Sequence, residues 1–133
     1  MEGAFHPPPN DYYANSYFSI YVESNWIQSD LIHITEKTFE PLLKGHFILP
    51  FSNPGTIQRL RDMGFQFPTF IDYSYDTELD VASRFAKLQE EFARLLCLDW
   101  PTLYTEHKDM LLHNQNCVNT IPFDTRILKH YNV

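Results

Sequence analysis

The sequence predicts an α/β fold, in which a Rossmann-like parallel sheet of few strands is flanked by helices and followed by a helical C-terminal third. Three observations support this fold class. Short runs rich in aromatic and β-branched residues alternate with helical patterns, as in sheets built from right-handed crossovers. The run "HFILPF" is apolar throughout, which is typical of a strand buried on both faces. A long amphipathic segment then begins near residue 81.

The chain is expected to hold one domain behind a short leader. The leader, residues 1–15, contains the run "HPPPN", whose consecutive prolines lack amide donors and favour extended backbone. The remaining residues, 16–133, have the length of a single domain with one hydrophobic core. Any function of the chain therefore depends on that core or needs a second chain.

Three strands are predicted. The run "SYFSIYVES" (16–24) is rich in aromatic and β-branched residues and is bounded by polar ones, which favours a buried strand. The run "HFILPF" (46–51) is a second strand, with Pro50 marking its end. A weaker third strand is expected near 67–72, within "FQFPTFIDYS".

The helix between the first two strands is expected to begin at Thr35, which can act as its N-cap, and to stop at Gly45. Pro41 lies beyond the first turn, so it should bend or shorten the helix unless the cap lies nearer Thr38. A further short helix is predicted over 56–63, before the stop at Gly64.

The strongest helical pattern follows "YDTE", and either Asp76 or Thr77 is expected to cap it. A second helix is predicted from Asp99, with Pro101 in its first turn. The tail, 117–133, is expected to form a short helix or an extended arm. The apolar face of the long helix is predicted to comprise Val81, Phe85, Leu88, Phe92, Leu95 and Leu96.

Composition excludes several classes of function. The formal net charge of −7, with no local run of Lys or Arg, argues against a nucleic-acid partner. No apolar run approaches the length of a membrane span, and no basic start precedes an apolar core, so a soluble, cytoplasmic protein is expected. Cys97 and Cys117 are interpreted as reduced thiols, and the histidines show no metal-ligand spacing.

The candidate site lies where the parallel strands end and the helices begin, because ligands bind at that edge of such sheets. Because the start of a helix has free amides and a partial positive charge, Thr35 to Thr38 would make an anion site. Lys37 adds a positive charge that the helix dipole alone disfavours, which suggests an anion nearby. Glu36 could accept ribose hydroxyls. The alternative is that Glu36 and Lys37 are solvated residues at a helix start.

Two further positions border the same edge. Glu23 ends a predicted buried strand, so its carboxylate must be paired, hydrogen-bonded or at the mouth of a site. In "SNPG", Asn53 and Gly55 could approach a phosphate through their backbone amides. Serving the geometry of a turn is the favoured role of both residues.

The run "YFSIYVESNWIQSDLIHITEKTFEPLLKGHFILPF" (17–51) resembles the donor-binding segment of fucosyltransferases and related GT-B glycosyltransferases. The shared features are an aromatic strand ending in Glu, a variable loop, a Thr-Glu-Lys helix start, a small-residue stop and a short apolar strand. The family's Glu-Asn-Ser is here Glu23-Ser24-Asn25, and Pro41 occupies the early helix. The runs "NPGTIQRLRDMGFQF" (53–67) and "FIDYSYD" (70–76) match loosely, and the C-terminal third does not match.

The resemblance implies a C-terminal, Rossmann-like half-domain that holds the nucleotide part of a sugar donor, with no further cofactor and no metal. Glu23 matches the strand-end Glu, Lys37 would neutralise the diphosphate and Glu36 would take a nucleoside hydroxyl. In this family the acceptor site and usually the catalytic base belong to an N-terminal half. The chain is therefore expected to need an acceptor-domain partner or to form a homo-oligomer. The alternative is a non-enzymatic interaction or self-associating module on the same fold.

Overall fold

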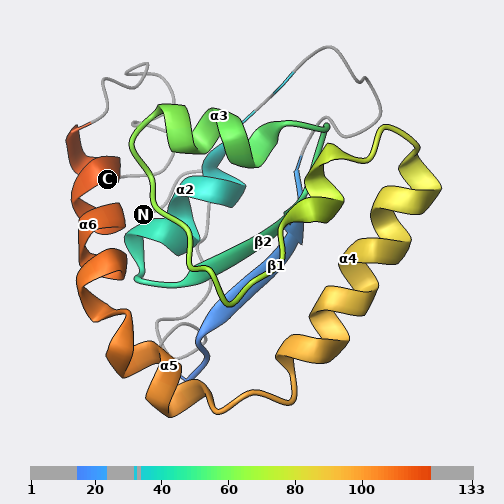
Figure 1. Cartoon of the computed structure of the whole chain (residues 1–133). Coiled ribbons are helices and arrows are strands. Elements are labelled where there is room, and N and C mark those ends of the chain that lie inside the picture. The colour runs from blue at the N-terminus through green and yellow to red at the C-terminus, as the bar shows by residue number, and fades with distance from the viewer. Residues whose placement is uncertain (1–14, 24–31, 33, 121–133) are drawn as a thin grey trace, which may run out of the picture.

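The structure, a computed structural model, describes residues 15–23, 32 and 34–120. The expected leader, apart from its last residue, and the last part of the expected tail (121–133) lie outside these residues. Figure 1 shows the order of the elements along the chain. They are β1 (Phe18–Val22), α2 (Glu36–Leu43), β2 (Phe47–Phe51), α3 (Thr56–Asp62), the 3₁₀ helix η1 (Ser74–Thr77), α4 (Val81–Leu95), α5 (Trp100–Glu106) and α6 (Lys108–Thr120).

The described part of the chain is an α/β fold with a parallel pair of strands. β1 and β2 run parallel, with Phe18 opposite Phe47 and Val22 opposite Phe51. α2 connects them, so the predicted strand–helix–strand unit is confirmed. Thr35 is the N-cap of α2, and Gly45, just past its end, has the left-handed φ of 78° that favours glycine.

The predicted third strand is wrong, because residues 67–72 form no strand in the structure. The outer edge of β2 is instead covered by side chains. The Tyr73 hydroxyl donates to Ile48 O (2.7 Å), and the Tyr75 hydroxyl donates to Pro50 O (2.6 Å). Pro50 also lacks an amide hydrogen, so this edge offers little to a further strand.

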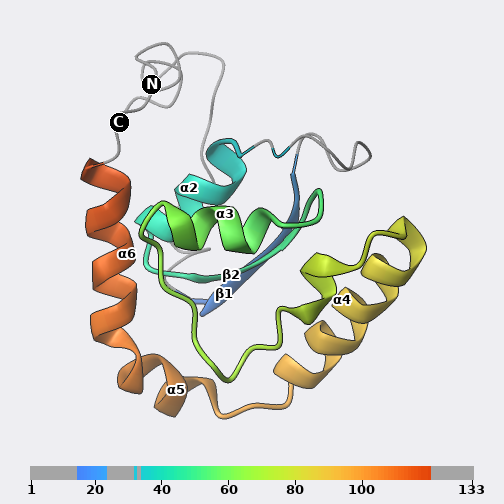
Figure 2. The same ribbon diagram turned by 45° about the horizontal axis from the view of Figure 1, so that its top comes forward.

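The sheet separates two hydrophobic clusters. On one face Phe47 and Leu49 pack with Leu88 of α4 and Trp100 of α5. On the other face Ile48 packs in the cluster that also contains Leu42 of α2 and Leu60 and Phe65. Figures 1 and 2 both show α2 and α3 close together, with α4 and α6 at opposite sides of the molecule. Because successive side chains of β2 point to opposite faces of the sheet, this one strand packs against helices on both faces.

The buried face of α4 differs from the predicted apolar face. Phe85 and Leu96 are exposed, whereas Arg84 and Glu91 are buried beside Leu88 and Leu95. The two charged residues can be buried because both make polar contacts. Arg84 Nη1 donates to Glu78 O (2.9 Å), and Glu91 accepts the Asp72 amide (2.8 Å).

Two predictions about the later helices are also corrected. The N-cap of α4 is Asp80, whose carboxylate accepts the Ser83 amide (2.9 Å), rather than Asp76 or Thr77. Asp99 is the N-cap of α5 (Trp100–Glu106), which agrees with the predicted helix start, but this helix stops before His107 and α6 begins at Lys108. Within the described part of the chain, no helix is long and apolar enough to cross a membrane.

Candidate functional site

The candidate site is the edge at which β1 and β2 end and α2 and α3 begin. Glu23 follows β1 directly and is only 1% exposed. Its carboxylate accepts hydrogen bonds from the Thr35 amide (2.9 Å) and the Thr35 hydroxyl (2.6 Å). A third bond comes from the Thr38 hydroxyl (2.8 Å). Glu23 is thus hydrogen-bonded to the first turn of α2, where its negative charge also suits the helix dipole.

Tyr21 extends this network from within β1. Its hydroxyl donates to Thr38 Oγ1 at 2.6 Å, while the Thr38 hydroxyl donates to Glu23. Burial raises the pKa of Tyr21 well above its usual value, and the nearby Glu23 charge raises it further. Tyr21 therefore keeps its proton and remains a donor. These hydrogen bonds run from Tyr21 to Thr38 and from Thr38 to Glu23, so they connect the end of β1 to α2.

Glu36 and Lys37 occupy the rim of this network. Lys37 Nζ lies 3.7 Å from Glu36 Oε2, and 45% of the Lys37 side chain is exposed. The Lys37 amide donates to Thr35 Oγ1 (3.2 Å), which confirms the capping role of Thr35. A partly exposed ion pair of this kind contributes little to stability. The pair is compatible with both earlier interpretations, a solvated helix start and a ligand-facing rim.

The loop after β2 is hydrogen-bonded to Asp76, which the sequence analysis expected at the start of the long helix instead. Gly55 begins α3 with a φ of 92°, a left-handed conformation that favours glycine. Asp76 Oδ2 accepts the amides of Gly55 (3.1 Å) and Ile57 (2.9 Å). The Gly55 amide is thus already bonded within the chain, which supports a turn role for Gly55. Asn53 is fully buried beside it.

Asp76 is an unusual carboxylate. Burial raises its pKa to about 6, although the amide bonds from Ile57 and Gly55 and the charge of Arg84 act in the opposite direction. Its second oxygen, Oδ1, is buried and has no hydrogen-bond partner among the described residues. Asp76 therefore titrates near neutral pH, unlike an ordinary surface aspartate.

Asp76, Arg84 and Tyr21 are the residues of this edge that sequence reasoning missed. The Arg84 guanidinium lies over the Phe51 ring at 5.1 Å, next to the end of β2. One signal for Arg84 was present, because it lies four residues before Leu88 and therefore on the buried face of the helix. The pairing of Asp76 with a loop about twenty residues earlier had no local signal.

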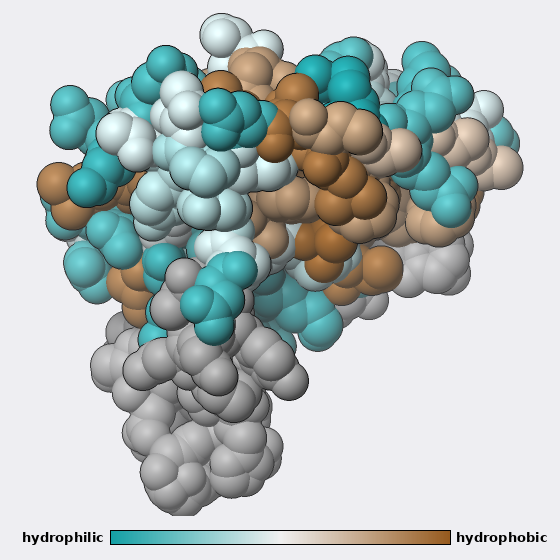
Figure 3. Space-filling model, turned by 90° about the horizontal axis from the view of Figure 1, so that it is seen from below, coloured by the Kyte–Doolittle hydropathy of each residue, from teal (hydrophilic) through white to brown (hydrophobic). Residues whose placement is uncertain are grey.

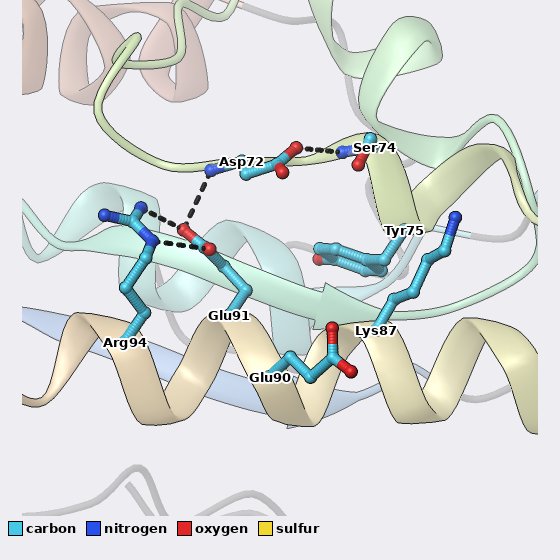
Figure 4. Close-up of a pocket in the computed structure, with 7 residues that line it drawn as sticks. All are labelled: Asp72, Ser74, Tyr75, Lys87, Glu90, Glu91 and Arg94. Carbon is cyan, nitrogen blue, oxygen red and sulfur yellow. Dashed lines mark hydrogen bonds and ion pairs between the residues drawn. The ribbon is translucent and has the colours of Figure 1, made fainter.

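Two pockets lie on either side of the segment around η1, and the second of them reaches this edge. One, of about 270 Å³, lies between α4 and the segment before η1 and is shown in Figure 4. Glu91 and Arg94 form an ion pair within it. Glu91 accepts from the Asp72 amide and from Arg94 Nε (2.9 Å), and the Ser74 amide lowers the pKa of Asp72. Its lining residues are Asp72, Ser74, Tyr75, Lys87, Glu90, Glu91 and Arg94.

The second pocket, of about 470 Å³, lies between α3 and the segment 67–77. Gly55 and Asp76 line it, and so does Arg61, whose guanidinium carbon lies 5.5 Å from the centre of the Phe67 ring.

The described residues contain no group of three or more His, Cys, Asp or Glu that could hold a metal ion. Cys97 and Cys117 are unbridged, as predicted, and burial raises the pKa of Cys117.

The structure thus brings Glu23 and Thr35 together, places Glu36 and Lys37 at the rim, and puts Asn53 and Gly55 in the neighbouring loop. No protein-family model, curated protein or solved structure matches the chain.

Proposed function

We propose that the chain is a Rossmann-like, nucleotide-sugar-binding domain of the GT-B glycosyltransferase kind, similar to the donor-binding half of fucosyltransferases. The supporting observation is the parallel β1–α2–β2 unit with an exposed ammonium, Lys37, in the first turn of α2. In sheets of this type a ligand lies beyond the carboxyl ends of the strands, and a phosphate favours the start of a helix.

The proposal gives the edge residues two different tasks. Glu23, Thr35 and Gly55 already bond within the chain, so they shape the edge rather than bind the donor. Lys37 is assigned to the diphosphate, because an ammonium pairs well with phosphate oxygens. Glu36, 3.7 Å from the Lys37 ammonium, is assigned to a nucleoside hydroxyl.

Transfer of the sugar is assigned to a second domain or chain. GT-B enzymes work in a cleft between two domains, and the acceptor and the usual base belong to the other half. On this proposal the chain binds a donor by itself and completes a transferase only with that partner. Calorimetry with GDP- and UDP-sugars tests the binding step directly.

The decisive variant is K37A. We expect about a tenfold loss of donor affinity, the usual effect of removing one charge-assisted contact. The matched control is K87A, because Lys87 also pairs with a glutamate and its side chain is 48% exposed. Binding that survives K37A unchanged, or no binding at millimolar donor, would contradict the assigned site. Equal losses in both variants would indicate a general charge effect instead.

A further inference from the structure

The two outer edges of the sheet differ in how their backbone groups are hydrogen-bonded. Along the outer edge of β2, the Ile48 and Pro50 carbonyls accept hydrogen bonds from tyrosine hydroxyls, and Pro50 has no amide hydrogen. This edge is therefore closed to a further strand. Natural proteins commonly protect strand edges in such ways, because an open edge recruits other strands.

Within the part of the chain that the structure describes, no side chain bonds to the outer edge of β1 in this way. The Phe47 amide donates to Tyr17 O (3.2 Å) at one end of the ladder. The Glu23 amide donates to Phe51 O (2.9 Å) at the other end. Since peptide groups alternate along a strand, these two bonds fix which groups point away from β2. They belong to Phe18, Ile20 and Val22, and among the described residues they have no hydrogen-bond partner.

The side chains beside this edge are apolar and exposed. Ile20 is 42% and Val22 is 49% exposed, and Phe85 of α4 is exposed as well. The ring centroids of Phe85 and Phe51 lie 5.5 Å apart, and those of Phe18 and Trp100 lie 4.9 Å apart. These residues therefore border the same face of the sheet. Figure 3 shows apolar side chains gathered in a band across the molecule seen from below. Exposed apolar side chains next to an open strand edge favour a bound strand.

We propose that the edge of β1 binds β1 of a second copy of the chain, antiparallel and centred on Ile20. Three outward residues spaced two apart are symmetric about the middle one. A twofold axis at Ile20 therefore pairs Ile20 with its own equivalent, and Phe18 with Val22 of the other copy. Every outward N–H then meets a C=O, and the two sheets become one of four strands.

Charge along β1 does not oppose a second copy as the occupant. β1 reads "FSIYV" and contains no charged residue, so two copies place no like charges opposite one another along the strand. The net charge of −7 is thus carried elsewhere on the molecule. The same axis brings together the Ile20 and Val22 side chains of both copies and removes them from water. This inference does not depend on the donor site.

Light scattering over a concentration series tests the proposal. The wild-type chain should have twice the monomer mass at high concentration, and the I20K and V22K variants should shift to the monomer mass with unchanged far-UV circular dichroism. The control is L112K, which adds the same charge at an exposed leucine of α6 and should leave the dimer intact. A wild-type chain that stays monomeric, or a dimer that persists in both β1 variants, overturns the proposal.

Cross-linking decides the register even if the lysine variants misfold. In a hydrogen-bonded antiparallel pair the Cα atoms lie about 5.5 Å apart, within reach of a disulfide. Mild oxidation of the I20C variant should therefore give a dimer linked through residue 20, as mass spectrometry of the linked peptide would show. The L112C variant should give no corresponding link. A linkage pattern that is equal in the two variants contradicts pairing through β1.

Discussion

The starts of α2 and α3 are both bonded to a buried carboxylate, but the two carboxylates meet different donors. Both helices follow a strand of the same sheet, and both receive a buried carboxylate from another part of the chain. Glu23 at α2 accepts two hydroxyls and an amide. Asp76 at α3 accepts two amides, has one oxygen with no partner among the described residues, and has a pKa raised to about 6.

The difference lies in the hydrogen-bond donors that each carboxylate meets. Hydroxyl donors can turn toward an oxygen, so the two threonines around Glu23 satisfy its charge from several directions. The backbone amides of α3 point in one direction and serve only one oxygen of Asp76. The start of α2 is therefore a structural joint in which both oxygens of Glu23 accept hydrogen bonds. At the start of α3 one buried oxygen of Asp76 has no partner among the described residues, and burial raises the pKa of this carboxyl to about 6.

The largest effect is expected from E23A. The change removes three hydrogen bonds to a buried charge and leaves the Thr35 and Thr38 donors without their acceptor. The free energy of unfolding should fall by about 4 kcal/mol, because bonds to charged groups contribute more than neutral ones. Urea unfolding at pH 7 measures the loss. A loss below about 0.5 kcal/mol would show that the joint is not structural.

The next effect is a pH dependence at Asp76. Because its pKa is about 6 in the fold and its usual value is 3.8, the folded protein binds more protons than the unfolded chain between these values. The free energy of unfolding should therefore fall as pH rises through this window, by at most about 3 kcal/mol from this group.

D76N isolates that contribution, since asparagine does not ionise. The difference in unfolding free energy between wild type and D76N should change across about pH 4 to 7. D72N is the control, because hydrogen bonds from Ser74 lower the pKa of Asp72 and its contribution has the opposite sign. A difference that stays constant with pH would contradict a raised pKa for Asp76.

A smaller effect is expected from T35A, which removes the N-cap of α2 and one donor to Glu23. The unfolding free energy should fall by about 1.5 kcal/mol. T105A is the comparison, because the Thr105 hydroxyl bonds only to the Pro101 carbonyl on an exposed surface. Equal losses in the two variants would show that the cap has no special role.

The smallest change in stability is expected from K37A, within about 0.5 kcal/mol, since its ion pair with Glu36 is partly exposed. The same variant is expected to lose donor affinity. Chemical denaturation and calorimetry on one sample separate the two quantities. A large loss of stability in K37A would place Lys37 in the structural joint with Glu23 rather than at a ligand.

The elements with local signals were predictable from the sequence. Thr35 and Gly45 bound α2, and the continuous apolar run gives β2. The third strand failed because the carbonyls it would have paired with are taken by Tyr73 and Tyr75 hydroxyls. That competition is decided by tertiary structure, so the composition of 67–72 alone could not reveal it.

The site was predictable in part for a similar reason. Glu23 stood out because a carboxylate at the end of a buried strand needs partners, and its partners prove to be Thr35 and Thr38. Asp76 was assigned to the nearest helix, α4, but its carboxylate bonds to the start of α3, because the 3₁₀ helix that contains Asp76 lies beside that start. Capping by a distant side chain leaves no pattern in the adjacent sequence.

Pro50 has a consequence for how far association can proceed. A protein with two open strand edges can add copies without end and grow into a fibre, as sheets in amyloid do. Here the proline and the tyrosine hydroxyls close one edge of the sheet, so each copy can offer only the other. On the proposed pairing, association through the edges of β1 and β2 therefore stops at two molecules.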